Sequence, residues 1–181
     1  MDEADVLIAH NGDGFDIKKI QARMLINKMT PMSPFESVDT LKAARASFKF
    51  SSNKLDDLGV MLGVGRKLPN AGMKLWTDCI EGKMKAWKEM KKYNKQDVVL
   101  LRDVYKKLRP WMANHPNLYK GDDIGCPKCE SNKVQKRGTY RTKTGVAYQR
   151  YYCKSCDSFS RARTAETSNA SNLPLKVVNR K

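Results

Sequence analysis

The chain begins with a short apolar run that ends abruptly in turn-forming residues. Residues 5–9 read DVLIA, a run typical of a buried parallel strand. The following HNGDGFD, residues 10–16, is rich in Asn, Gly and Asp, which form local turns. From Phe15 to about Lys28, apolar residues recur at helical spacing with polar residues between them. The pattern therefore predicts a strand, a tight turn and an amphipathic helix.

Two shorter helices are predicted next. Residues 30–34, TPMSP, break the pattern and form a loop. Asp39 can accept hydrogen bonds from the first backbone N–H groups of a helix over TLKAARASF. A further helix starts near Asn53 and ends before Gly63, which stands where a helix-terminating glycine is expected.

A helix-rich region follows from Met73, with an interruption near Gly82. Its second part ends at Arg109, because Pro110 cannot readily continue a helix. Beyond it lie a polar linker, a cysteine-containing appendage and a polar tail without periodicity. The expected organisation is an α/β domain over 1–118, the appendage over 119–163 and a flexible basic tail over 164–181.

The charge balance indicates a polyanionic partner. The 181 residues include 35 Lys and Arg against 19 Asp and Glu, a formal net charge of +16, and half of this excess follows residue 120. Such a balance favours nucleic acid or another anionic surface. No apolar run approaches the roughly 18 residues of a membrane span, and the acidic start differs from a signal peptide. We expect a cytoplasmic protein with no membrane partner.

Four of the five cysteines form two CxxC pairs, CPKC and CKSC, separated by 23 residues. Each pair can direct two thiolates at one point, and two pairs make the four-sulfur tetrahedral site of structural Zn2+. β-Branched and aromatic residues around KTG predict a hairpin between the pairs. We interpret the appendage as a zinc ribbon whose metal stabilises the fold and does not catalyse. The expected zinc ligands are Cys126, Cys129, Cys153 and Cys156. The remaining Cys79 is expected to be a buried apolar residue.

Basic side chains and tyrosines alternate over the predicted ribbon. Basic side chains bind phosphates and exposed tyrosines stack on bases, so the ribbon is a candidate for nucleic-acid contact. The alternatives are a solvated ribbon that packs its tyrosines around the zinc, or one that binds protein. The candidate contacts are Lys136, Arg137, Arg141 and Arg150.

The stretch KKYNKQDVVLL places Tyr93 and Asp97 four residues apart on one face of a predicted helix. Taken alone, this spacing indicates a packed tyrosine and a carboxylate in a surface ion pair. Together with HNGDGFD, however, it resembles the second and third motifs of the DnaQ-like 3′–5′ exonucleases of the tyrosine (DEDDy) subclass. The resemblance extends to VDTLKAAR and SNKLDDLGVMLGVGRK, and to phage and bacterial exonucleases with a C-terminal zinc ribbon, so that it covers about residues 4–160.

This resemblance implies an RNase H-like α/β fold and a two-metal hydrolysis of the terminal phosphodiester with Mg2+ or Mn2+. It implies that Asp97 ligates the first ion, that Asp16 faces the second, and that Tyr93 orients the attacking water. Asn11 and Phe15 would shape the site and its contact with the terminal nucleotide. The expected substrate is nucleic acid, with DNA preferred and RNA left open, and the expected location is the cytoplasm of a bacterium or of a phage-infected host.

The family also has an Asp-x-Glu pair on its first strand, whereas no Asp in this chain has a Glu two residues later. We therefore expect an exonuclease domain that lacks its first β-strands and the carboxylates that bridge the two metals. Three interpretations are open: the C-terminal portion of a longer or interrupted reading frame, a partner of a second chain that supplies the missing strands, or a remnant that only binds nucleic acid. In each case the isolated chain should be inactive or nearly so. The competing function is a non-catalytic zinc-ribbon nucleic-acid-binding protein.

Overall fold

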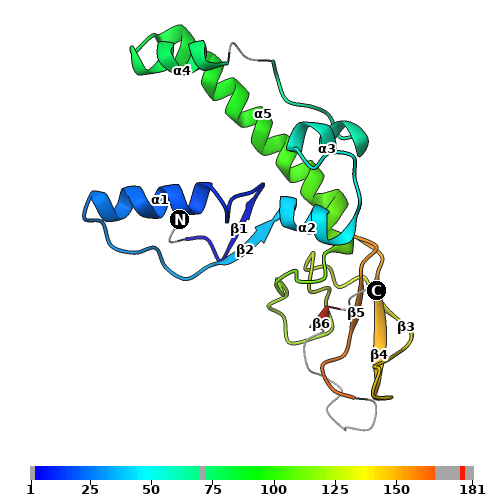
Figure 1. Cartoon of the computed structure of the whole chain (residues 1–181). Helices are drawn as coiled ribbons and strands as arrows, with labels where there is room; N and C mark the ends of the chain where they lie inside the picture. The colour runs from blue at the N-terminus through cyan, green and yellow to red at the C-terminus, as the bar shows by residue number, and fades with distance from the viewer. Residues whose placement is uncertain (1–2, 70–71, 166–175, 178–181) are drawn as a thin grey trace. The chain divides into compact units, whose positions relative to one another are not determined.

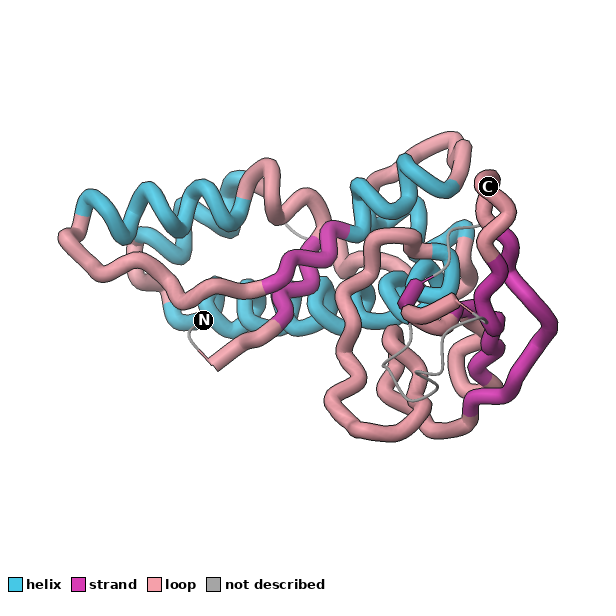
Figure 2. Tube along the Cα trace, turned by 90° about the horizontal axis from the view of Figure 1, so that it is seen from below, coloured by secondary structure: helices cyan, strands magenta, loops and turns pink. Residues whose placement is uncertain are grey.

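The computed structural model describes residues 3–69, 72–165 and 176–177, in two compact units (Figure 1). The first unit is Met1–Lys107 and the second is Leu108–Lys181. The strands, magenta in Figure 2, form one sheet in each unit. Among the described helices, none combines the length and the apolar composition that crossing a bilayer requires.

The first unit contains a parallel strand pair joined by a helix. β1 pairs with β2 in parallel, with Val6 opposite Glu36 and Ala9 opposite Asp39, and α1 connects the two strands. The predicted first strand and helix are confirmed, whereas β2 has the sequence ESVD, too short and polar to be recognised from its pattern. The elements of this unit are β1 (Val6–Ala9), α1 (Asp16–Ile26), β2 (Glu36–Asp39), α2 (Thr40–Ser47), α3 (Leu55–Met61), α4 (Met73–Ile80) and α5 (Met84–Leu108).

Helix α1 forms where the apolar spacing predicted it, but its apolar face is not buried. None of its residues is buried, and Leu25 is 80 % exposed. A helix that connects parallel strands normally covers its apolar face with the sheet. The sheet of this unit has two strands, which present too small a surface for that purpose.

Helices α2, α3 and α5, together with β2, contribute one group of buried residues in this unit. The Asp39 carboxylate accepts hydrogen bonds from the backbone N–H groups of Leu41 and Lys42, which confirms the predicted cap of α2. Gly59 on α3 lies against α5: a Cβ there would be 2.6 Å from Leu100 Cδ1. The buried side chains include those of Val38, Ala44, Leu58, Leu100 and Val104.

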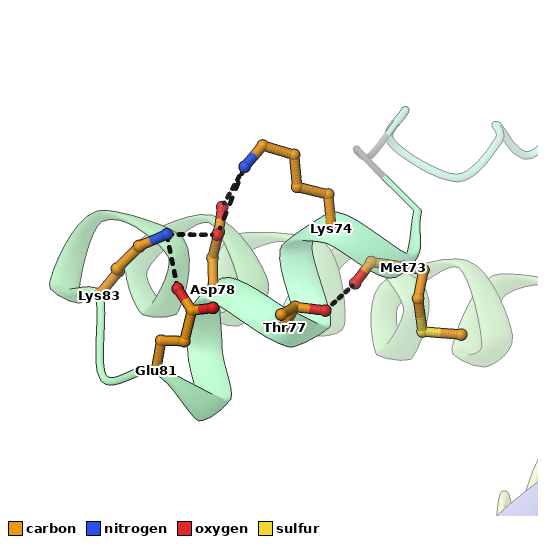
Figure 3. A network of polar contacts seen from close by, with 6 residues as sticks. All are labelled: Met73, Lys74, Thr77, Asp78, Glu81 and Lys83. Atoms are coloured by element: carbon orange, nitrogen blue, oxygen red, sulfur yellow. Dashed lines mark hydrogen bonds and ion pairs between the residues drawn. The ribbon is translucent and has the colours of Figure 1, made fainter.

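Helices α4 and α5 form a hairpin around the predicted break at Gly82, whose φ of +79° suits glycine. Cys79 is buried with Leu75, Ala86 and Met90, so its prediction as a packed apolar residue is confirmed. Exposed ion pairs surround the turn: the Asp78 carboxylate accepts from Lys74 and from Lys83, which also pairs with Glu81 (Figure 3).

The second unit is an antiparallel sheet in the order β3-β4-β5-β6, preceded by a short 3-10 helix. The predicted hairpin is confirmed, with a turn in which Thr142 N–H donates to Val146 O at 2.9 Å. The elements are η1 (Arg109–Trp111), β3 (Val134–Arg141), β4 (Ala147–Cys153), β5 (Phe159–Arg161) and β6 (Lys176–Val177).

The segment expected to be a polar linker packs against the cysteine-containing part. Leu118 N–H donates to Pro127 O at 2.8 Å, and His115 is buried. The chain accordingly divides after Lys107 in the structure. Of the expected tail, 166–175 and 178–181 lie outside the described residues, whereas β6 pairs with β5.

Candidate functional site

The carboxyl ends of β1 and β2 lie side by side, the usual position of ligand sites in open α/β sheets. Asn11 N–H donates to Asp39 Oδ1 at 2.9 Å and joins the two strand ends. The His10 ring lies between Thr40 Oγ1 and Asn53 O, each 2.9 Å from a ring nitrogen. Burial lowers the pKa of His10 and favours the neutral ring. His10 therefore fastens the end of β1 to α2 and to the segment before α3.

The turn between β1 and α1 presents Asp16 and Phe15 to solvent. Asn11 has a φ of +64°, and a Cβ at the buried Gly12 would clash with Ala9, so this turn needs glycine. Phe15 N–H donates to Asn11 O at 3.0 Å, and the Phe15 ring is 56 % exposed. Asp16 is the first residue of α1 and is exposed. The turn thus places an aromatic ring and a carboxylate at the end of the strand pair.

Asp13 in the same turn has a structural role. Its carboxylate pairs with the Lys42 ammonium at 2.7 Å and accepts a hydrogen bond from the Ser37 hydroxyl. These contacts, with Lys42 the larger, hold the pKa of Asp13 below its usual range. The turn is thereby tied to β2 and α2.

Tyr93 and Asp97 lie on α5 and meet through a third residue, Lys67. The Lys67 ammonium donates to Asp97 Oδ2 at 2.8 Å and to the Tyr93 hydroxyl at 3.3 Å. It also lies 5.5 Å from the centre of the Tyr93 ring. Burial disfavours the charged ammonium, but the hydrogen bonds to Asp97 and Tyr93 outweigh it and raise the pKa of Lys67. Sequence reasoning missed Lys67, because a loop lysine has no periodic signal that distinguishes it.

The carboxylates of this unit provide some, but not all, of the ligands that a divalent cation needs. Asp97 Oδ1 and Asp39 Oδ2 are buried and have no hydrogen-bond partner among the described residues. An unpaired buried carboxylate oxygen is costly, and a cation would satisfy it. However, within the described ranges no three carboxylate or His groups of this unit gather closely enough to share an ion. The structure therefore joins Tyr93 to Asp97 and does not build a complete metal site around Asp16 and Asp97.

Beside Tyr93 and Asp97, α5 also presents a basic groove. Leu68 lines it from the neighbouring loop, and the helix contributes one continuous face spaced at three and four residues. The lining residues of α5 are Lys88, Lys91, Lys92, Lys95, Gln96 and Val99. Sequence reasoning also missed this groove, although the spacing of its four lysines on a predicted helix is a usable signal.

Comparison with protein families identifies this domain. A family model described as RNase_H superfamily matches residues 1–109, which include both strand ends, Lys67, Tyr93 and Asp97. The chain belongs to the RNase H superfamily. Comparisons with curated proteins and with solved structures found no match. Membership confirms the expected RNase H-like domain and supports metal-dependent hydrolysis of nucleic acid as its type of activity.

Outside the part matched as RNase H-like, four cysteines form a second candidate site. The Sγ atoms of Cys126, Cys129, Cys153 and Cys156 all lie within 4.8 Å of one another. Two of these pairs, Cys126 with Cys156 and Cys129 with Cys153, are 3.6 Å apart. A tetrahedral site with Zn–S bonds of about 2.3 Å has sulfur atoms about 3.8 Å apart. The predicted cysteines therefore converge on a cluster that could hold a metal ion.

The two CxxC segments have the same backbone conformation. In each, the residue after the second cysteine is left-handed, Glu130 at φ +60° and Asp157 at φ +58°. Its N–H donates to the carbonyl of the first cysteine at 3.0 Å in both segments. The repeated turn points both pairs of thiols at one position, as the spacing predicted.

The polar surroundings of the cluster favour thiolate at one cysteine. A hydrogen bond from Cys156 lowers the pKa of Cys126, while the shared proton raises the pKa of Cys156. The Ser158 hydroxyl lies 3.4 Å from Cys126 Sγ and 3.1 Å from Cys156 Sγ. Metal binding requires thiolates, so this arrangement suits a soft cation.

The four predicted nucleic-acid contacts of the appendage are divided between the two faces of the sheet. Lys136 pairs across the strands with Tyr151, and Arg141 pairs with Ala147, on one face. Arg150 lies on the opposite face, and its Nε–H donates to Arg137 O at 2.8 Å. The four residues therefore do not form one patch.

Proposed function

We propose that the chain acts as the metal-binding and substrate-binding portion of a 3′–5′ exonuclease on DNA. The observation that supports it most is the pairing of Tyr93 and Asp97 on α5, with Asp97 Oδ1 buried and unpaired, in a domain of the RNase H superfamily. In this proposal Asp97 and Asp16 hold divalent cations. Mg2+ or Mn2+ bound there would activate water and stabilise the leaving oxygen.

The side chains around these carboxylates have defined roles in the proposal. The Tyr93 hydroxyl orients the attacking water. Lys67 donates hydrogen bonds to that hydroxyl and to Asp97 and so fixes their relative positions. The exposed ring of Phe15 contacts the terminal nucleotide, and Asn11 shapes the turn that presents it. The lysines along the α5 groove bind the backbone phosphates of the strand.

Two carboxylates are too few for a pair of divalent ions, so the proposal includes a partner chain that supplies further oxygen ligands. The edges of the two-stranded sheet are where strands from such a chain would pair. We expect the isolated chain to be inactive or nearly so.

The second part of the proposal concerns the cysteine-containing unit. The sulfur distances and the two identical turns support a zinc ribbon with a structural Zn2+ ion held by four thiolates. A closed four-sulfur site leaves no open position for substrate, so the ion would stabilise the unit. The enzyme would act in the cytoplasm of a bacterium or of a phage-infected host.

A second candidate function is a nucleic-acid-binding protein without catalysis. The observation that favours it is the Lys67 ammonium, which already pairs with Asp97 Oδ2 at 2.8 Å and competes with any metal there. In this alternative the first unit keeps the fold of the superfamily and contributes only its basic groove.

Binding of Mn2+ distinguishes the two candidates without relying on activity. Titration of the full chain with Mn2+ is followed by paramagnetic broadening of backbone NMR signals. Under the exonuclease proposal, signals near Asp16, Tyr93 and Asp97 broaden first, and Asp97→Asn abolishes the effect at α5. The matched control is Asp103→Asn on the same helix, where the carboxylate pairs with Arg102. Equal broadening in both variants would reject metal binding at Asp97 and leave the non-catalytic alternative.

The direction of cutting is tested on single-stranded DNA with a label at its 5′ end. Removal of nucleotides from the 3′ end would produce a ladder of shortened labelled products. Robust Mn2+-dependent shortening by the isolated chain, lost in Asp97→Ala, would contradict the expected inactivity and support the enzyme directly.

A further inference from the structure

The sheet of the second unit has two chemically different faces. Side chains alternate along a strand, and residues paired across strands share a face. Tyr148, Arg150 and Tyr152 are every second residue of β4 and so point to the same face. Their partners on the neighbouring strands are Tyr140 for Tyr148, Arg161 for Arg150, and Phe159 for Tyr152. These six residues, all arginine or aromatic, therefore share one face.

The opposite face is the one that is buried. Tyr151, Cys153 and Ser160 alternate with the residues above, and all three are buried. The arginine–aromatic face is partly exposed at each of its six positions. None of its aromatic rings belongs to the buried cluster around the cysteines, against which Val134 packs.

On this partly exposed face, the open face, arginine guanidinium groups lie over the aromatic rings. The Arg161 guanidinium is 4.0 Å from the centre of the Tyr148 ring and 5.7 Å from that of Tyr140. Arg150 lies 5.5 Å from the Phe159 ring, and Arg137 lies 6.0 Å from the Tyr152 ring. Arg150 Nε–H donates to Arg137 O and Arg161 Nη1–H donates to Ala162 O, so the other N–H groups of each guanidinium are the ones that can bind an oxyanion.

We propose that the open face of the β3–β4–β5 sheet binds single-stranded nucleic acid, with phosphates on the arginine edges and unpaired bases on the rings. Aromatic rings on a flat sheet stack on bases only where these are not paired with another strand. An acidic peptide has carboxylates for the arginines but no bases for four rings. The chemistry of the face therefore fits a single strand better than a duplex or a peptide.

This site is independent of the exonuclease proposal, because it uses no metal and no residue of the first unit. Binding is measured by fluorescence anisotropy of the full chain without added divalent ions. The probes are a labelled single-stranded DNA, the RNA of the same sequence, and the corresponding duplex. We expect both single strands to bind more tightly than the duplex. The difference in affinity between the DNA and RNA strands shows whether the face distinguishes deoxyribose from ribose.

Variants at Tyr148 and Arg161 test the stacking directly. Tyr148→Leu should weaken single-strand binding about 5- to 100-fold, whereas Tyr148→Phe, which keeps the ring, should bind almost as tightly as the wild type. Arg161→Lys keeps the charge but loses the planar fork, and it should also weaken binding. Lys154→Gln, at an exposed lysine of the second CxxC turn, is the control for loss of charge alone.

Bound zinc per chain, measured on each variant, verifies that the unit remains folded. The proposal is overturned if Tyr148→Leu binds the single strand as tightly as the wild type does. It is also overturned if the wild type and every variant bind the duplex as tightly as the single strand. It is also overturned if poly-glutamate displaces the single strand while the ring variants have no effect, which would assign the face to acidic polypeptides.

Discussion

The basic groove of α5 makes a quantitative prediction about the salt dependence of nucleic-acid binding. We consider a variant in which all four groove lysines become glutamine: Lys88, Lys91, Lys92 and Lys95. If each lysine neutralises one phosphate of a single strand, each contributes about −0.7 to the slope of log K against log salt concentration. The variant should therefore have a slope shallower by about 2.8. Between 50 and 200 mM salt, the wild type should lose about 50-fold more affinity than the variant.

The variant is expected to fold, because glutamine is nearly as good a helix former as lysine and relieves the repulsion between lysines three and four residues apart. Anisotropy titrations with a labelled single strand at several salt concentrations give the slopes. The control variant replaces four exposed lysines outside the groove with glutamine, so that its net charge equals that of the groove variant. These are Lys18, Lys49, Lys106 and Lys107. Equal slopes for the two quadruple variants would show that total charge, and not the groove, attracts the strand.

Four other outcomes are expected. Lys67→Met removes the ammonium that pairs with Asp97 and should lower the apparent Kd for Mn2+ about 3- to 10-fold in calorimetric titrations; weaker Mn2+ binding would refute the idea that Lys67 competes with the metal. Cys126→Ser should release bound zinc, measured by elemental analysis, whereas Cys79→Ala in the other unit should retain it. Gly59→Ala should destabilise the chain to urea by about 1–3 kcal/mol, because its Cβ would be 2.5 Å from Gly65 O; unchanged stability would show that the loop adapts. Because the pKa of the half-buried His10 is below 6.5, its ring binds protons more readily in the unfolded chain. Stability to urea should therefore fall as the pH drops below 6.5, and His10→Gln should lose that part of the pH dependence.

Several features could be predicted from the sequence because they depend on neighbours along the chain. The cap at Asp39, the break at Gly82 and the stop at Pro110 each reflect a local backbone requirement. The cysteine cluster was also predictable, because the CxxC turn itself directs both thiols and the hairpin brings the second turn to the first. Strand β2 was missed for the converse reason: ESVD has no apolar pattern, and its pairing with β1 determines its conformation.

The amino-acid sequence by itself determined the local elements, the cysteine site and the positions of Tyr93 and Asp97 on one helix face. Only the tertiary structure decided that Lys67 lies between these two side chains, that α1 has no buried face, and that the arginines stack on one face of the β3–β4–β5 sheet. The physical reason is the range of the interactions. Turns, caps and helix faces follow from a few adjacent residues, whereas the partner of a loop lysine and the exposure of a helix depend on which distant segments pack against them.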